Sequence, residues 1–516
     1  MLNKEPIASP QGTATSVELS GTGSMPDAAL ETTAPATRIF QNIVTLIGGQ
    51  GLNLVLSASA TILLARYLGT AQLGEFGALY AYLGLYGWLS TFGLDSILAR
   101  QVAQDRSRAG SILLTGLCVS SLFAMGSVAI ALLFAPLFGY GGSLRILLIV
   151  ASVDILLLSP LRLPGIIFQV DLRQWYGVGI SLLRQIVWLL VLVVMAATRA
   201  GLFSIILGRT GCALLEVALI GVAIHRKGFL TRPWRLLPAE IKKYLMYGFP
   251  LAVSTLAVGI YHRIDQVMLH KMVNDQVLGN YVAAVRLTEF INLLPIAVMT
   301  SLFPILSQTA NDGDRFRHYL RLSFRALMAI AFGICLVVTL FPMPIVFFLY
   351  GVKFIAAGPL LAVLIWSEVP VFFGVVISNA LVTKNLQNYL PVATGIGAVI
   401  NILLNLYWIP RWSAIGAAWA TNISYTLGGI LLFFVFPRTR SVAWIGFRIL
   451  VPPCLLTLFI TLLFKDVRVL EIVRFLASLL LYVLGAWLLG IIRNSDVGRL
   501  WQLLGKNLAA LKTHVF

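Results

Sequence analysis

The sequence predicts an all-α, polytopic membrane protein whose chain crosses the bilayer about fourteen times. It has 516 residues, of which 59% are hydrophobic and only 11% are charged. A soluble globular protein needs a larger charged fraction to cover its surface. Between residues 38 and 493 we count fourteen apolar runs of about 20 residues, separated by short polar hinges. At 1.5 Å per residue, each run is long enough to span the roughly 30 Å hydrocarbon core once.

Each apolar run is assigned to one helix. In order, the predicted spans are 39–65, 76–98, 110–137, 143–164, 176–198, 201–225, 246–269, 279–307, 323–349, 355–382, 388–409, 413–436, 444–464 and 471–492. No connecting segment is long enough for a soluble catalytic domain, so we expect any function to reside in the helix bundle.

The spans divide as six, six and two. The predicted parts are a first six-helix lobe at 38–225, a cytoplasmic linker at 226–243, a second six-helix lobe at 244–436 and two additional C-terminal helices at 437–492. Segments 1–37 and 493–516 are interpreted as cytoplasmic tails. We expect the first tail to be disordered because it is rich in Ser, Thr, Ala, Gly and Pro and has no apolar run.

A short internal repeat agrees with two six-helix halves. Leu-Gly-Glu-Phe at 73–76 opens the second span, and Leu-Gly-Asn-Tyr at 278–281 opens the eighth span, 205 residues later. Each motif follows the first helix of a half, although two short matches can also arise by chance. Transporters are commonly built from such repeats, with the substrate between halves that rock against each other.

The net charge of +18 is interpreted as a signal of orientation rather than of nucleic-acid binding. With the N-terminus in the cytoplasm, 25 of the 38 Lys and Arg residues fall in inward hinges and tails, and nine fall in outward hinges. Cytoplasmic loops of membrane proteins carry such an excess of positive charge. Because the number of helices is even, we predict that both termini are cytoplasmic.

Three segments carry a family resemblance. They are the hinge at 65–77, which begins Ala-Arg-Tyr-Leu-Gly, the Tyr-Gly-Phe-Pro sequence at 247–250, and the stretch at 401–424, which contains Asn-Ile-Leu-Leu-Asn and Gly-Ala-Ala-Trp-Ala. These segments resemble the Wzx-type oligosaccharide flippases, the polysaccharide-export branch of the multidrug/oligosaccharidyl-lipid/polysaccharide (MOP) superfamily. Ser413 stands where that family usually has glycine. The resemblance covers residues 39–436 and implies two six-helix lobes in a V and export of a polyprenyl-diphosphate-linked oligosaccharide.

Ionisable side chains within the spans are the first functional candidates. Each costs about 2.5–3.5 kcal/mol to insert and therefore needs a partner or a watery cavity. They are Asp95, Asp154, Arg184, Arg209, Glu216, Arg263, Asp265, Arg286, Glu289 and Glu368. Helical spacing predicts the local pairs Arg209–Glu216, Arg286–Glu289 and His262–Asp265. Such pairs either fix the helix register or take part in transport, and we keep Glu216, Asp265 and Glu289 as charge-coupling candidates.

Four arginines are the candidates for substrate binding. Arg184, Arg209, Arg263 and Arg286 come from the fifth to eighth helices, two from each half, and we predict that they line a shared central cavity. A guanidinium suits a diphosphate because its planar fork donates two hydrogen bonds and stays charged when desolvated. Four cations near the middle of the membrane favour an anionic cargo, whereas an exporter of cations would be expected to have mostly carboxylates in its cavity.

Two prolines within spans are candidate hinges for alternating access. Pro250 lies in the seventh span and Pro295 in the eighth. Proline removes a helical hydrogen bond and kinks the helix. Static kinks that help packing are the alternative interpretation.

Together these observations predict a flippase that moves polyprenyl-diphosphate-linked oligosaccharide from the cytoplasmic to the outer leaflet, in a bacterial inner membrane. The alternative is an ion-coupled exporter of small cationic compounds. A glycan polymerase or ligase is a third class, but we would expect it to carry a large outward loop. We find no enzyme motif, no metal-ligand spacing among the four cysteines and no cofactor motif. The expected partners are the lipid-linked oligosaccharide, membrane lipids, and a polymerase and glycosyltransferases of the same pathway, without nucleic acid.

Overall fold

A computed structural model describes residues 28–229, 234–465, 467 and 470–491, and within them the chain is helical with no strand. The all-α prediction is confirmed. Twelve helices in this part of the chain are long and apolar enough to cross a membrane. The predicted C-terminal tail at 493–516 lies outside the described residues, as does 1–27 of the N-terminal tail. The remainder of that expected tail is already helical, because α1 begins at Ala28.

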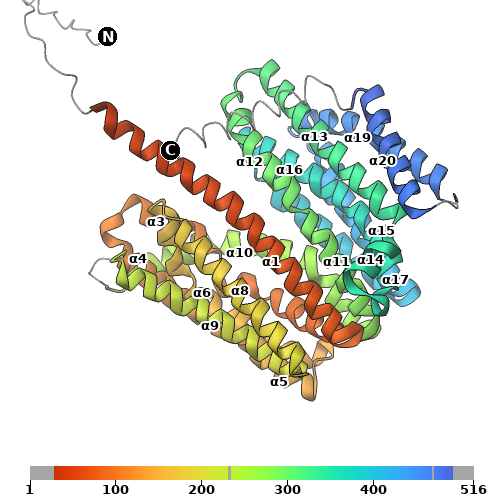
Figure 1. Ribbon diagram of the computed structural model, residues 1–516. Coiled ribbons are helices and arrows are strands. Elements are labelled where there is room, and N and C mark those ends of the chain that lie inside the picture. Colours follow the sequence, from red (N-terminus) through yellow and green to blue (C-terminus); the bar gives the residue numbers. More distant parts are fainter. Residues whose placement is uncertain (1–27, 230–233, 466, 468–469, 492–516) are drawn as a thin grey trace, which may run out of the picture.

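The first half of the chain forms one group of helices in Figure 1. Its helices are α1 (Ala28–Gly84), α2 (Gly87–Thr91), α3 (Leu94–Gln104), α4 (Ala109–Phe134), α5 (Ser143–Ser152), α6 (Leu158–Leu161), α7 (Ile166–Val170), α8 (Trp175–Ala197) and α9 (Leu202–Arg226). Between α5 and α6 the chain forms a π-helical turn, η3 (Val153–Leu157).

The second half forms the other group, and α1 runs between the two groups (Figure 1). Its helices are α10 (Pro238–Met272), α11 (Asp275–Ile291), α12 (Leu293–Gln308), α13 (Gly313–Leu340), α14 (Pro342–Tyr350), α15 (Ala357–Leu364), α16 (Glu368–Thr383), α17 (Tyr389–Thr426), the π-helical η7 (Leu427–Leu431) and α18 (Leu432–Val435). The connection between α9 and α10 is therefore shorter than the predicted linker at 226–243.

The long helix α1 is a hairpin. Its backbone is non-helical at Gly69, where φ is 73° and ψ is −176°. Ser57 and Phe76 line the same cavity, whereas a straight helix would hold them roughly 28 Å apart. The chain therefore reverses at Gly69, and only glycine adopts this left-handed conformation without strain.

The helix α17 is a second hairpin, with its reversal at Ser413. The amide of Asn401 donates to the hydroxyl of Ser424 at 2.9 Å, although the two residues would be roughly 35 Å apart along a straight helix. Ser413 has φ of 52°, in the left-handed region that favours glycine. When both hairpins are counted as two passes, the twelve candidate helices of the described chain make the fourteen predicted crossings.

Hydrogen bonds between hinges show which hinges share one end of the bundle. Arg106 donates to Asp171 at 2.7 Å and to the carbonyl of Phe229 at 2.5 Å, which joins the hinges after the second, fourth and sixth crossings. Lys384 likewise donates to the carbonyl of Ala310 and joins the hinges after the eighth and tenth crossings. We call the end that carries these hinges the basic end.

The remaining hinges meet at the opposite end. The hydroxyl of Tyr67 donates to the carbonyl of Ala200 at 2.7 Å, within the first half. Arg66 donates to the carbonyl of Leu349 at 2.8 Å, between the two halves. Alternate hinges therefore share an end, as the predicted order of crossings requires.

The two copies of the repeat contact each other near this opposite end. A Cβ on Gly74 would overlap the carbonyl oxygen of Asp275, and a Cβ on Gly279 would overlap that of Thr70. The contact is reciprocal, because each partner residue precedes its own glycine by four positions. The halves thus meet through equivalent surfaces, as expected for a pseudo-twofold arrangement, and glycine at both positions permits this close approach of helix backbones.

The two C-terminal helices pack against the second half. They are α19 (Arg440–Phe464) and α20 (Glu471–Leu488). The hydroxyl of Tyr482 donates to the carbonyl of Ala329 in α13 at 2.7 Å, and Thr457 donates to that of Phe332 at 3.4 Å. These helices lie at the edge of the molecule in Figure 1 and line none of the cavities described below.

Several predicted spans are interrupted in the structure. The second, 76–98, is divided among the end of α1, α2 and α3. The expected ninth span, 323–349, is divided, because α13 ends at Leu340 and α14 begins at Pro342; proline is tolerated in the first turn of a new helix but not in a helix interior. The eighth span is interrupted at Asn292, between α11 and α12. Of the four cysteines, Cys212 and Cys335 are buried, Cys454 is half-buried and Cys118 is exposed.

Candidate functional site

A cavity with an empty volume of about 810 Å³ lies where the two halves meet. Its walls come from both arms of the α1 hairpin, from α8 and α9, and from α11 of the second half. Its polar and charged lining consists of Ser57, Thr61, Arg184, Gln185, Arg209 and Arg286. The structure therefore brings together three of the four arginines singled out from the sequence, and they come from three different helices.

Arg263, the fourth arginine, is not among the lining residues of this cavity. Its side chain lies over Gly84 of α1, where a Cβ would come within 2.9 Å of Cδ and 3.2 Å of Nε. The missing side chain of Gly84 leaves a groove that the arginine stem fills. Helical position alone could not predict this placement, because it depends on the neighbouring helix.

Two carboxylates form ion pairs with the arginines of the first half. Asp154, which is only 5% exposed, accepts from Nε of Arg209 at 3.1 Å and from Arg162 at 3.3 Å. Glu216 lies 2.9 Å from Nε of Arg162 and 3.5 Å from Nε of Arg184. Three guanidinium groups thus share two carboxylates, which leaves one excess positive charge in this network.

The predicted pair of Arg209 with Glu216 is wrong. Seven residues along a helix correspond to roughly 10 Å of rise, too far for a direct ion pair. Asp154 replaces Glu216 as the partner of Arg209 because it projects from the π-helical turn η3. π-Helical turns are frequent at functional sites, but no feature of the local sequence predicts this one.

Arg162 is a member of the site that sequence reasoning missed. It lies two residues before the end of the predicted span 143–164 and is counted among the inward basic residues, yet it bridges Asp154 and Glu216 from the segment between α6 and α7. The only hint of this ion pair in the sequence is that Arg162 follows Asp154 by eight residues. That spacing is too long for a pair on a regular helix, so the pair can be recognised only when the π-helical turn between the two residues is known.

The arginines of the cavity retain many unused donors. A guanidinium carries five N–H groups. In the described chain, Arg286 hydrogen-bonds only through Nη1, to Glu289 at 2.6 Å, and Arg209 only through Nε. The buried Nε of Arg184 has no hydrogen-bond partner. The guanidinium of Arg209 also lies 4.4 Å from the ring centre of Tyr80. The predicted pair of Arg286 with Glu289 is confirmed, and the remaining donors are available to an anion.

Asp265 belongs to a separate, closed polar cluster. It accepts from the hydroxyl of Tyr281 and from the backbone N–H of Gln266, and it is 6% exposed. The predicted pair of His262 with Asp265 does not form, because His262 hydrogen-bonds to Tyr425. Residues three apart lie close enough on a helix to pair, but here hydrogen-bond partners on other helices, Tyr425 for His262 and Tyr281 for Asp265, replace that contact.

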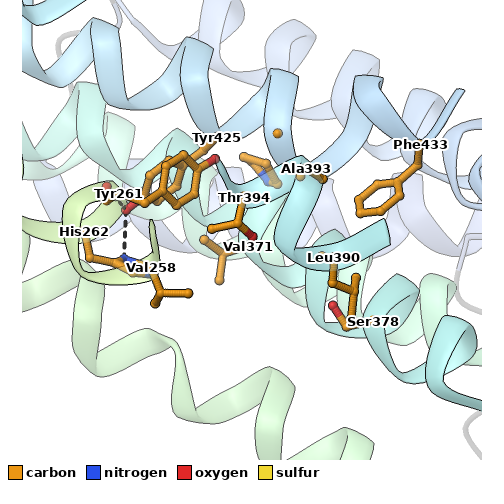
Figure 2. A pocket seen from close by; sticks show the side chains of 14 residues that line it. Val258, Tyr261, His262, Val371, Ser378, Leu390, Ala393, Thr394, Tyr425 and Phe433 are labelled. Carbon is orange, nitrogen blue, oxygen red and sulfur yellow. Dashed lines mark hydrogen bonds between the residues drawn. The ribbon is translucent and has the colours of Figure 1, made fainter. Parts of the chain in front are cut away.

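His262 borders a second cavity, within the second half. This cavity has an empty volume of about 680 Å³. Figure 2 shows His262, Tyr261 and Tyr425 at one end and Ser378, Leu390 and Phe433 at the other. The dashed line marks the 2.9 Å hydrogen bond between His262 and Tyr425. No guanidinium or carboxylate lines it, so it does not share the charge of the cavity between the halves.

The two candidate hinge prolines occupy different positions. Pro250 lies inside α10, where it removes a backbone hydrogen bond. Pro295 lies in the first turn of α12, directly after the break at Asn292. The interruption of the eighth crossing therefore precedes Pro295 rather than being centred on it.

Comparison with known sequences identifies relatives of this chain. A model of the family described as "Polysaccharide biosynthesis protein" matches residues 63–359. The "Probable low-salt glycan biosynthesis flippase Agl15" of Haloferax volcanii is 23% identical over 387 residues, which cover 71% of this chain and 77% of the relative. The "Probable flippase AglR" of the same organism is 26% identical over 278 residues, or 52% of this chain and 57% of that protein.

Solved structures with the same fold are also found. The lipid II flippase MurJ in an inward closed conformation matches with a TM-score of 0.68 and 17% identity, over 86% of this chain and 98% of MurJ. An inward-facing multidrug resistance MATE family transporter of the MOP superfamily matches with a TM-score of 0.56 and 16% identity, over 77% of this chain and 93% of the transporter. The predicted MOP-superfamily fold is confirmed.

Proposed function

Because the chain belongs to the polysaccharide biosynthesis protein family, we propose that it is a flippase for polyprenyl-diphosphate-linked oligosaccharide. It would carry this lipid from the cytoplasmic to the outer leaflet by alternating access. Two relatives with flippase in their names, Agl15 and AglR, support the proposal. It assigns binding and movement to the chain, and no catalytic step.

The observation that carries the proposal is the convergence of Arg184, Arg209 and Arg286 on one cavity. Each keeps N–H donors without a partner in the described chain. Charge-assisted hydrogen bonds from arginine to phosphate are among the stronger polar contacts in proteins. A diphosphate that enters the cavity would therefore meet donors from both halves at once.

The location of the cavity suits a rocking movement. Arg286 belongs to the second half, whereas Arg184 and Arg209 belong to the first, so a bound diphosphate would link the halves. Glu216 and Glu289 are the charge-coupling residues nearest to it, since each is an ion-pair partner of a cavity arginine. We propose that Asp265 is also a charge-coupling residue, although it does not line the cavity. We propose that Pro250 and Pro295 are bending points.

The alternative, export of small cationic compounds, is disfavoured by the charge of the cavity. The network around it contains four arginines, Arg162 and the three that line the cavity, and three carboxylates, Asp154, Glu216 and Glu289. A cationic ligand would be repelled by the excess arginine, in a membrane interior where charges interact strongly.

The proposed setting is the inner membrane, with the basic end of the bundle and both termini in the cytoplasm. A polymerase and glycosyltransferases of the same pathway would supply and consume the cargo. Membrane lipids surround the bundle, and leucines with large exposed fractions, such as Leu462 at 73% and Leu488 at 75%, face outward.

The orientation can be tested with single cysteines at opposite ends of α10. Arg235 and Lys271 are both exposed, and they flank the seventh crossing. In a variant without native cysteines, Lys271→Cys should react with an impermeant maleimide added outside intact cells, and Arg235→Cys should react only after permeabilisation. Reaction of Arg235→Cys in intact cells would reverse the proposed orientation.

The function can be tested by depleting the protein from its native cell. Lipid-linked oligosaccharide should then accumulate on the cytoplasmic leaflet, protected in intact cells from an impermeant lectin or glycosidase, while surface glycan falls about tenfold or more. Normal surface glycan together with retention of cationic dyes would instead favour the exporter. Normal surface glycan together with normal dye retention would reject both functions.

A further inference from the structure

A third cavity, within the first half, is lined by amide and hydroxyl side chains. It has an empty volume of about 650 Å³ and lies between α1, the segment around α7, and the start of α8. Its polar lining consists of Gln50, Asn53, Gln169, Gln174 and Ser181. No charged side chain lines it, although the Arg106–Asp171 pair of the basic end lies only one hinge away. We call it the amide cavity.

The amide cavity shares two walls with the arginine cavity. On α1, Asn53 lines the first and Ser57 the second, one helical turn or about 6 Å apart. On α8, Ser181 lines the first and Arg184 the second, about 4.5 Å apart along the axis. The amide cavity lies on the side toward Gln169 and Gln174, which flank a hinge of the basic end. A group attached directly to a diphosphate at Arg184 could therefore reach it.

The hydrogen-bonding groups of the amide cavity are incompletely used. The amide of Asn53 donates to the hydroxyl of Ser181 at 2.7 Å, which fixes both side chains and leaves the Asn53 carbonyl oxygen without a partner in the described chain. Gln50 and Gln169, whose side chains are exposed, likewise have no protein partner there. An amide offers two donors and an acceptor, and a hydroxyl offers both roles.

We propose that the amide cavity binds the first sugar residues of the cargo, next to the diphosphate held by the arginines. Sugar hydroxyls each donate and accept a hydrogen bond, as amide and serine groups do, and neutral sugars need no counter-charge. An acyl chain would leave these polar groups unpaired at a cost, and a phosphate would find no cation. This inference rests on the proposed function and adds a site of glycan selectivity to it.

Two glycines of α8 provide a substitution that would block the amide cavity and a control for it. A Cβ at Gly177 would meet nothing closer than 3.8 Å, from Phe168, so a larger side chain at this position would grow into the cavity. Gly179, two residues further along α8, has no neighbour within 4 Å and does not line the cavity. Gly177→Leu and Gly179→Leu therefore form a matched pair of blocking and control variants.

The test compares two lipids on the purified full-length protein in lipid nanodiscs. The first probe is the polyprenyl-diphosphate glycan extracted from cells depleted of this protein, and the second is bare polyprenyl diphosphate. The wild-type protein should bind the glycan lipid about tenfold more tightly than the bare lipid. Gly177→Leu and the double variant Asn53→Ala/Ser181→Ala should remove this preference and leave the affinity for bare diphosphate unchanged, while Gly179→Leu keeps both.

Each other result has a definite meaning. Equal wild-type affinity for the two lipids overturns the sugar site and leaves the proposed function standing. Equal weakening of both lipids by the cavity variants also overturns it, because the cavity would then only support the fold. Failure of the wild-type protein to bind either lipid contradicts the proposed function itself, together with this inference.

Discussion

Replacement of Arg184 and Arg286 together is expected to lower the affinity for polyprenyl diphosphate by about a hundredfold or more. Both side chains line the cavity between the halves, one from each half. Loss of one hydrogen-bonded contact with a charged group costs about 1.5–3 kcal/mol, or roughly 10- to 150-fold in affinity. Binding to the purified variants and export of surface glycan are the measurements, with the amount of protein in the membrane determined alongside.

The choice of arginines separates cargo binding from structural pairing. After Arg184→Ala, Glu216 keeps the closer Arg162 at 2.9 Å, so no carboxylate is left alone. Arg286→Ala would leave Glu289 without its partner, and it is therefore combined with Glu289→Gln. Arg145→Ala, at an exposed position outside the cavity, serves as the control. Lysine at position 184 should rescue binding only partly, because an ammonium lacks the planar fork.

The outcome distinguishes the two interpretations of these arginines. Loss of binding and export at normal abundance supports contact with the cargo. Loss of abundance in both Arg184→Ala and Arg286→Ala/Glu289→Gln would assign the arginines to folding instead. Full export by the Arg184→Ala/Arg286→Ala/Glu289→Gln variant would refute the cationic cavity as the cargo site.

Gly74→Ala combined with Gly279→Ala is expected to reduce export more than about tenfold. A single methyl at each position would overlap a backbone oxygen of the opposite half, at Asp275 and Thr70. Because backbone cannot rotate away, the halves must separate at this end, and such overpacking costs about 1–3 kcal/mol per site. In a helix, alanine itself is about 1 kcal/mol more favourable than glycine, so local helix weakening cannot explain a loss.

Export and the melting temperature of the purified protein are measured for this pair of substitutions. Gly126→Ala is the matched control, because a Cβ at Gly126 meets nothing within 4 Å; it should leave export unchanged and preserve or raise the melting temperature. Export and melting temperature both at wild-type values in the double alanine variant would show that the halves do not approach this closely during transport.

The sequence predicted features that depend on hydropathy and charge counts. The crossings, the alternation of hinges and the two halves follow from the length of apolar runs and the distribution of Lys and Arg. The repeated Leu-Gly motif proved informative in a way that its position alone did not reveal, because Gly74 and Gly279 face each other's helix. A reciprocal contact of this kind appears only when the two halves are assembled.

Side-chain partners were predicted less well, for a physical reason. Helical spacing correctly gave Arg286 and Glu289, which are three residues apart. It failed for Arg209, whose partner Asp154 comes from a π-helical turn of another crossing, and for His262, which hydrogen-bonds to Tyr425 rather than to Asp265. The amide cavity was also missed, because Asn53 and Ser181 are 128 residues apart and neither is charged.

The most direct test of the central claim is translocation by the purified protein in proteoliposomes that contain the extracted polyprenyl-diphosphate glycan. The fraction of glycan accessible to an external glycosidase should rise with time in vesicles containing the wild-type protein. Vesicles containing Arg184→Ala/Arg286→Ala/Glu289→Gln should stay at the level of protein-free vesicles. Equal rates for wild-type and variant protein, or no translocation by the wild type under any imposed ion gradient, would contradict an arginine-lined cavity that carries a lipid diphosphate across the membrane.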